Sequence, residues 1–255
     1  MLEKEEIQRI ADIKGLSLKN TEKDYLLEIT LFVLFNEVGK KLAFKGGTAL
    51  YKLHSLNRFS EDLNFTLVSH KIEINKLLTK IIRKLSDIGI NGRSKEIIDY
   101  KNQKNIRLEL IGPLFDGNPK NICLISMNIS LKEKPLYELE QRKIFSQYTD
   151  IPAFDVFIMA IDELLAEKMR ALLTRNKARD VYDVWFLLNK GAHLNIKDVN
   201  KKLKLYNKLF SKKFFLEKID EKKKSWAMDL KNLIIGELPG FHKIRKEIEL
   251  FISLR

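Results

Sequence analysis

The first forty residues have the apolar spacing of helices. Within residues 25–35 the apolar side chains form a dense helical face that we expect to pack on a sheet. Residues 42–45 then read as a short apolar strand that ends at two glycines, and residues 48–54 as a short helix. This order predicts a strand, a glycine turn and a helix, preceded by helices.

Residues 62–67 alternate between polar and apolar side chains. Asp62, Asn64 and Thr66 share one face of the predicted strand, and the residues between them share the other. Polar chemistry is therefore expected on the first face.

Beyond this strand, residues 72–88 have helical periodicity, and three strand candidates follow at 93–100, 105–111 and 122–131. From Asp155 onward the pattern is helical. The fold class expected is α/β (α+β), a small mixed sheet with packed helices followed by an all-helical region.

A plausible boundary between these parts is marked by Pro152. We therefore expect two domains, an α/β domain over residues 1–150 and a helical C-terminal domain over residues 151–255. No internal repeat is visible.

The chain carries 47 lysines and arginines against 34 acids, a net charge of +13, and 45% hydrophobic residues argue for a globular protein. Residues 197–224 contain eleven lysines and four acids. Such a segment attracts polyanions, commonly nucleic acid, but a solvated helix surface explains it equally well.

A single cysteine, Cys123, forbids an intrachain disulfide, and the four histidines (His54, His70, His193 and His242) lack zinc-ligand spacing. The N-terminus has no signal-peptide core, and no apolar run reaches the roughly 18 residues of a membrane span. We expect a soluble cytoplasmic protein without membrane contact. A monomer is the default, because no coiled-coil pattern is present.

Gly46 and Gly47 lie between the first strand and the following helix, which begins at Thr48. Glycines let the backbone approach a ligand closely, and the free N–H groups of a helix N-terminus favour phosphate. Turns of this kind are also common for steric reasons alone.

Acids spaced two apart on a strand can hold Mg²⁺ against triphosphate oxygens. Here Asp62 is followed by Asn64, whose amide ligates without a formal charge, and Asn128 is central on the polar face of a later strand. Glu109, on another nearby strand, is a candidate for the missing acid, but its orientation does not follow from the sequence. An exposed polar strand face is the simpler interpretation.

Lys168 falls within an apolar helical stripe, where an ammonium group needs an anion. That anion is either a bound phosphate or Asp183, which shares a helix face with Asp180 and Leu187. On the residues alone, a structural Lys168–Asp183 ion pair is slightly favoured over contact with a nucleotide.

These motifs together resemble the AbiEii/AbiGii nucleotidyltransferase toxins, which belong to type IV toxin–antitoxin pairs and to the polymerase-β-like nucleotidyltransferase superfamily. The first matching motif comprises Gly46, Gly47, Thr48, Leu50, Arg58, Ser60, Glu61 and Asp62. The second comprises Glu167, Lys168, Arg170, Ala171, Leu172, Arg179, Asp180 and Asp183. The resemblance covers roughly residues 20–190.

The resemblance implies a polymerase-β-like core and transfer of a nucleoside monophosphate from an NTP to an acceptor hydroxyl, with Mg²⁺ or Mn²⁺ as cofactor. Some members act on the 3′ end of transfer RNA, and an antitoxin protein is the implied partner. Catalytic roles are implied for Asp62, Lys168 and Asp183.

The implied nucleotide-binding residues are Gly46, Gly47, Thr48, Arg58, Ser60 and Lys168. The implied metal ligands are Asp62, Asn64 and Asn128.

The chain departs from the family at two of these ligands, because Asn64 and Asn128 stand where acids are expected. Loss of two charges would weaken Mg²⁺ binding by several kcal/mol in a poorly hydrated site. Two hypotheses follow. One is an active nucleotidyltransferase, and the other is a pseudoenzyme that binds a nucleotide or RNA.

Overall fold

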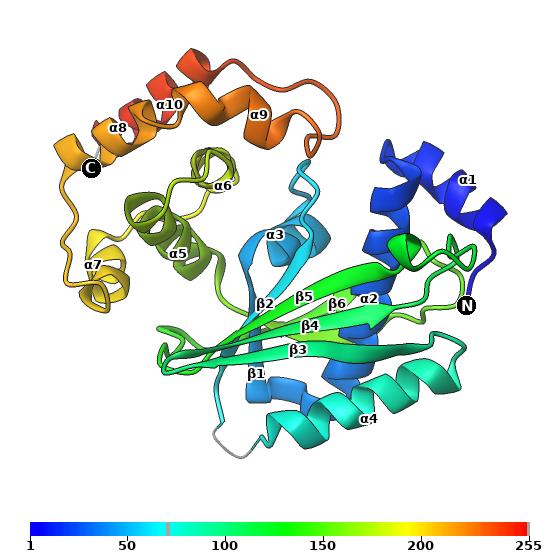
Figure 1. Ribbon diagram of the computed structural model, residues 1–255. Helices are drawn as coiled ribbons and strands as arrows, with labels where there is room; N and C mark the ends of the chain where they lie inside the picture. Colours follow the sequence, from blue (N-terminus) through cyan, green and yellow to red (C-terminus); the bar gives the residue numbers. More distant parts are fainter. Residues whose placement is uncertain (70–71, 254–255) are drawn as a thin grey trace. The chain divides into compact units, whose positions relative to one another are not determined.

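A computed structural model describes residues 1–69 and 72–253, and the chain divides into two compact units (Figure 1). We call the first the sheet unit; it comprises Met1–His54, Phe59–Pro135 and Leu139–Ile158. We call the second the helical unit; it comprises Ser55–Arg58, Leu136–Glu138 and Met159–Arg255. His70, one of the four histidines considered above, lies outside the described residues.

The sheet unit combines helices with one mixed sheet. Its helices are α1 (Lys4–Lys14), α2 (Leu18–Val38), η1 (Gly39–Lys41), α3 (Gly46–His54), α4 (Ile74–Asp87) and η2 (Pro119–Asn121). Its strands are β1 (Leu42–Lys45), β2 (Asp62–Leu67), β3 (Gly92–Tyr100), β4 (Gln103–Leu110), β5 (Cys123–Ser130), β6 (Glu140–Ile144) and β7 (Phe154–Ile158). They form a seven-stranded sheet in the order β3-β4-β5-β2-β1-β7-β6.

The central strand β2 pairs antiparallel with β1 and parallel with β5. One face of the sheet is apolar and packs on α2, where Phe35 meets Phe44 and Phe65 at ring-centroid distances of 6.2 and 6.1 Å. The alternation within β2 therefore buries Phe65 beneath α2 and turns Asp62 and Asn64 to the opposite face.

Side chains of that opposite face line up across four neighbouring strands. Lys45 of β1 pairs with Asn64 of β2, which pairs with Asn128 of β5, which pairs with Asn105 of β4. Directly paired residues of adjacent strands point to the same side of a sheet. The register thus gathers one lysine and three asparagines into a single row beside Asp62.

Two strands differ from the sequence-based expectation. The expected helix from Asp155 is wrong at its start, because Phe154, Val156 and Ile158 are buried in alternation along β7. The edge strand β6 was not predicted, since Ile144 is its only buried residue. A polar edge strand carries little hydrophobic pattern to recognise.

The helical unit is built from α5 to α10 and a short 3₁₀ helix (Figure 1). Its elements are α5 (Ile161–Thr174), α6 (Arg179–Asn189), α7 (Ile196–Lys204), α8 (Lys212–Asp220), η3 (Lys223–Ser225), α9 (Trp226–Leu230) and α10 (Phe241–Ser253). The predicted fold class, a mixed α/β core followed by helices, is confirmed. Within the described ranges, none of the helices is both long and apolar enough to cross a membrane.

Candidate active site

The glycine turn packs directly against β2. Gly46 has a φ of +83°, and a Cβ atom at this position would lie 3.1 Å from Cβ and Nδ2 of Asn64. Both the backbone conformation and the close approach favour glycine. The turn at the N-terminus of α3 therefore lies against the polar face of the sheet.

Thr48 fixes the start of β2. Its buried hydroxyl donates to the carbonyl oxygen of Asp62 at 2.7 Å and lies 3.4 Å from that of Ser60. The Thr48 side chain thus positions the backbone that presents Asp62. The hydroxyl proton is thereby committed to a backbone carbonyl oxygen.

A buried charge cluster anchors α3 on α2. Lys52 lies 2.7 Å from Asp24 and forms an ion pair with Glu28, and the side chains of all three residues are at most 5% exposed. Burial alone would lower the pKa of Lys52, but the charges of Asp24 and Glu28 outweigh it and raise that pKa. The cluster was not predicted; its one signal is a pair of acids spaced four apart in the apolar stretch of α2.

The two asparagines at expected metal-ligand positions are hydrogen-bonded to each other. Asn128 donates from Nδ2 to Oδ1 of Asn64 at 3.3 Å, and Asn64 donates from Nδ2 to the Asp62 carbonyl at 3.3 Å. Asp62 is thus the only carboxylate among the three predicted ligands. One carboxylate and two amide oxygens fit a single Mg²⁺ ion that arrives with NTP phosphates, but not a two-metal site.

Other acids do not complete this set. The carboxylate of Glu109 binds Arg93 and Lys95, each at 2.8 Å, and these hydrogen bonds lower its pKa. Glu109 is therefore committed to two cations on β3. Among the residues that the structure describes, no group of three or more His, Cys, Asp or Glu side chains could hold a metal ion.

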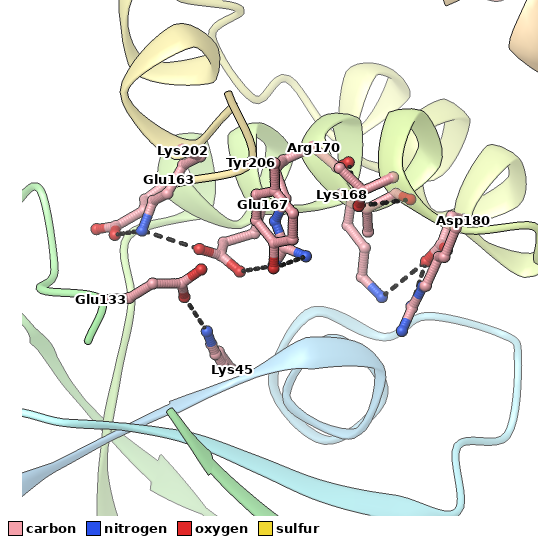
Figure 2. Close-up of polar contacts among 12 residues, drawn as sticks. Lys45, Glu133, Glu163, Glu167, Lys168, Arg170, Asp180, Lys202 and Tyr206 are labelled. Carbon is pink, nitrogen blue, oxygen red and sulfur yellow. Dashed lines mark hydrogen bonds and ion pairs between the residues drawn. The ribbon is translucent and has the colours of Figure 1, made fainter. Parts of the chain in front are cut away.

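Lys45 adds a cation to the polar row. Its ammonium group lies 2.6 Å from Glu133, and both side chains are buried (Figure 2). Lys45 immediately precedes the glycine turn, so its place beside that turn could be seen in the sequence. Its partner Glu133 lies in a loop after β5, and nothing in the sequence indicated this pairing.

In the helical unit, Arg58 and Lys168 bind one carboxylate. Arg58 donates from Nε and from one terminal nitrogen to the two oxygens of Asp183, both at 2.9 Å. Lys168 lies 2.6 Å from the same carboxylate. The buried ammonium group therefore has the Asp183 partner foreseen for it.

The environment of Asp183 sets its protonation state. Burial would raise the pKa of this fully buried acid, but the charges of Arg58 and Lys168 lower it to about 2. A carboxylate this acidic does not accept a proton near neutral pH. Asp183 is therefore suited to positioning the two cations rather than to general base catalysis.

Four further ion pairs extend the network around α5, and Figure 2 shows those of Lys168 and Lys202. Arg175 donates twice to Asp180 at 2.7 Å, and Asp180 lies 3.7 Å from Lys168. On another side of α5, Lys202 of α7 lies 2.6 Å from Glu163 and 2.9 Å from Glu167. Buried charges of both signs thus join α5 to α6 and to α7.

The structure divides the predicted site residues between the units. The sheet unit contains Gly46, Gly47, Thr48, Ser60, Asp62, Asn64 and Asn128. The helical unit contains Arg58, Lys168 and Asp183. Arg58 was predicted to bind the nucleotide, but its guanidinium is 1% exposed and held by Asp183. Its geometry supports a positioning role.

Three solved structures share this fold. One is a crystal structure of JHP933 from Helicobacter pylori, with a TM-score of 0.61, 22% identity, and coverage of 94% of this chain and 92% of that chain. A second structure from H. pylori has a TM-score of 0.63, 22% identity, and coverage of 94% and 95%. The third is MenT4, a nucleotidyltransferase toxin from Mycobacterium tuberculosis, with a TM-score of 0.60, 15% identity, and coverage of 100% and 99%.

Sequence comparison gives the family. No curated protein matches the sequence. A family model described as the nucleotidyl transferase AbiEii toxin of type IV toxin–antitoxin systems matches residues 31–247. This match extends well beyond residue 190, where the motif resemblance ended, and includes the whole lysine-rich segment of residues 197–224. The chain belongs to the AbiEii family of nucleotidyltransferase toxins.

Proposed function

We propose that the protein transfers a nucleoside monophosphate from an NTP to an acceptor hydroxyl, as the toxin of a type IV toxin–antitoxin pair. The observation that carries this proposal is the packing of the Gly46 turn against β2, which presents Asp62 on the polar face of the sheet. Family membership supports the same reaction class.

The first residues of α3 supply the proposed phosphate site. Backbone N–H groups at a helix N-terminus are unsatisfied within the helix and carry a partial positive charge. Gly46 and Gly47 add no side chain between this backbone and a ligand. We assign the triphosphate to this turn.

Lys168 is assigned a phosphate contact, with Asp183 and Arg58 as positioning residues. The ammonium group of Lys168 has three N–H groups, and its carboxylate neighbours are Asp183 at 2.6 Å and Asp180 at 3.7 Å. Donor capacity is therefore left for a phosphate oxygen. Asp183 holds Lys168 in one orientation, which reduces the entropy lost when a ligand binds.

Asp62, with the side-chain oxygens of Asn64 and Asn128, would hold one Mg²⁺ or Mn²⁺ ion. Such an ion neutralises phosphate charge when it is bound. The Asn64 oxygen has two lone pairs, so it could accept the hydrogen bond from Asn128 with one and ligate the ion with the other. The chain's own part is to present one fixed carboxylate, because Thr48 holds the Asp62 backbone.

We propose RNA, and transfer RNA in particular, as the acceptor, a cognate antitoxin as the protein partner, and the cytoplasm as the location of this protein. The net charge of +13 favours association with a polyanion. An antitoxin is implied by the type IV family.

Label transfer tests the proposal. Purified protein is incubated with each of the four α-labelled NTPs, Mg²⁺ or Mn²⁺, and total transfer RNA, beside an Asp62→Asn variant. The expected result is label on RNA with the unsubstituted protein and none with Asp62→Asn. If no label is transferred with Mg²⁺ and none with Mn²⁺, native activity is refuted. Transfer by an Asn64→Asp variant would then show that the missing acid at position 64 is the cause.

A second candidate function is a pseudoenzyme that binds a nucleotide or RNA without catalysis. The hydrogen bond between Asn128 and Asn64, at positions where acids are expected, favours it. This candidate predicts that nucleotide binding is the same with Mg²⁺ and with EDTA. Calorimetric titration distinguishes the two, because strongly metal-dependent binding contradicts the pseudoenzyme.

A further inference from the structure

A hollow of about 570 Å³ lies on the helical unit, along α7 and the turn that follows it. Its lining residues are Lys197, Asn200, Lys201, Lys204, Asn207, Lys208 and Leu209. Four of these seven residues are lysines and none is an acid. We call this surface the lysine hollow.

Helical geometry separates the lysines of α7 into two sets. Lys197, Lys201 and Lys204 recur at intervals of four and three and are exposed on one face. Lys202 is 3% exposed and bound to Glu163 and Glu167. Glu163 and Glu167 are therefore engaged by the buried Lys202, which lies apart from the exposed set.

Few acids neutralise the lysines of the hollow. Lys201 pairs with Asp198 at 3.0 Å, and Lys208 donates to the carbonyl oxygen of Leu173 at 3.1 Å. Lys197 and Lys204 make no ion pair with any described residue. Like charges held this close repel one another, and a ligand with several regularly spaced negative charges relieves that repulsion.

The other acids of the lysine-rich segment do not change this balance. Asp220 binds Arg245 at 3.1 Å, and Glu221 binds Lys218 at 2.7 Å. Glu217 does not line the hollow. These three acids therefore leave the four exposed lysines that line the hollow without further neutralisation.

Planar and apolar groups accompany the charge. Tyr206 is 44% exposed, and the guanidinium of Arg170 lies 5.2 Å from its ring centroid. Leu209 is 76% exposed within the lining. Aromatic rings and guanidinium planes beside a basic groove are the elements that stack unpaired bases.

We propose that the lysine hollow binds the phosphate backbone of single-stranded RNA, with Tyr206 stacking a base. The lysines would contact the phosphates, and the Asn200 and Asn207 amides could hydrogen-bond the sugars. The exposed ring of Tyr206 could stack on a base. An acidic protein could satisfy the charge, but the stacking arrangement of Tyr206 with Arg170 favours RNA. That this RNA is the acceptor strand rests on the proposed function; the binding itself does not.

Fluorescence anisotropy with a labelled single-stranded RNA of about 16 nucleotides tests the proposal, without NTP or divalent metal. The hollow variant is Lys197→Gln/Lys201→Gln/Lys204→Gln/Lys208→Gln. Its matched control removes the same charge from exposed positions outside the hollow, as Lys223→Gln/Lys224→Gln/Lys243→Gln/Lys246→Gln. Circular dichroism verifies that both variants fold.

The hollow variant is expected to bind RNA at least about tenfold more weakly than the control. The slope of log K against log salt concentration is expected to be smaller by about 3, because each of the four lost phosphate contacts contributes about 0.7 on a single strand. Equal affinities for the two variants would overturn the proposal. Should the hollow variant fail to fold, Lys197→Gln/Lys204→Gln, which breaks no ion pair, is expected to give a smaller loss of the same kind, and no loss would overturn it.

Two further measurements distinguish RNA from an acidic protein as the ligand of the lysine hollow. The absence of NTP also keeps this test separate from the proposed nucleotide transfer. Tyr206→Ala is expected to weaken RNA binding while leaving the salt slope unchanged. If poly-glutamate of equal charge bound as tightly as RNA, the hollow would be a site for acidic protein and the proposal would be wrong. Because no NTP is present, failure of nucleotide transfer leaves this result unaffected.

Discussion

Arg58 binds both carboxylate oxygens of Asp183, at 2.9 Å each, although 125 residues separate them in the sequence. Arg58 belongs to the first of the two matching motifs, and Asp183 ends the second. The bond therefore explains why both motifs include a buried charged residue. It also gives Arg58 a structural task in place of the nucleotide contact expected from the sequence.

Removing the charge of Asp183 is expected to destabilise the helical unit. Asp183→Asn leaves Arg58 and Lys168 buried without their shared anion, which costs about 3–5 kcal/mol in free energy of unfolding. Urea denaturation measures this loss. The control is Asp220→Asn, which breaks the exposed pair with Arg245 and is expected to cost less than about 1 kcal/mol. Equal costs for the two variants would contradict a buried network.

Acid is expected to remove the same stabilisation. Burial raises the pKa of Asp183, but Arg58 and Lys168 lower it from 3.8 to about 2. A depressed pKa stabilises the fold at pH values above the ordinary pKa, and this contribution is lost as the pH falls from about 4 towards 2. Carboxyl-carbon NMR titration, with Asp183→Asn for assignment, is expected to show Asp183 still ionised at pH 3. Half-protonation near pH 4 would contradict the assigned environment.

The glycine turn is expected to tolerate no side chain at position 46. Gly46→Ala adds the cost of a positive φ, about 1–2 kcal/mol, to the displacement of Asn64. The matched control is Gly117→Ala, where φ is +91° but no atom lies within 4 Å of the added Cβ. Thermal unfolding should show a larger loss at Gly46 than at Gly117. Equal losses would mean that the turn does not press on β2.

Restoring an acid at position 64 is expected to strengthen metal binding. Asn64→Asp adds a unit charge beside Asp62, and at an effective dielectric constant of ~20 this raises Mn²⁺ affinity at least about tenfold. Electron paramagnetic resonance of free Mn²⁺ measures the affinity independently of activity. Asn105→Asp is the control, because it makes the same change in the same row of side chains, two strands from Asn64. A similar gain in both variants would place the metal elsewhere.

Local patterns were sufficient for most of the fold. The strand at β2 was predicted because its alternation is strict, and α3 because two glycines open it. In contrast, β6 has three exposed residues among five and a single buried one, and its pairing with β7 depends on contacts that no local pattern encodes. The helical expectation failed at β7 because a short buried strand and a helix segment have similar apolar content.

The sequence predicted which residue types belong to the candidate site, but it did not predict all of their hydrogen-bond and ion-pair partners. Lys168 was identified as needing an anion, and Asp183 was one of two anions considered. The bidentate bond from Arg58 was not foreseen, since a short segment between α3 and β2 joins the helical unit only in three dimensions. The hydrogen bond between Asn64 and Asn128 likewise follows from strand order, because β5 lies beside β2 in the sheet.

The central claim is nucleotide transfer, and its most direct test is the initial rate of label incorporation into transfer RNA at equal concentrations of the unsubstituted protein and Asp62→Asn. Transfer by the unsubstituted protein that is abolished in Asp62→Asn is the predicted result. Equal incorporation by both proteins, or none by the unsubstituted protein with Mg²⁺ and with Mn²⁺, would contradict it.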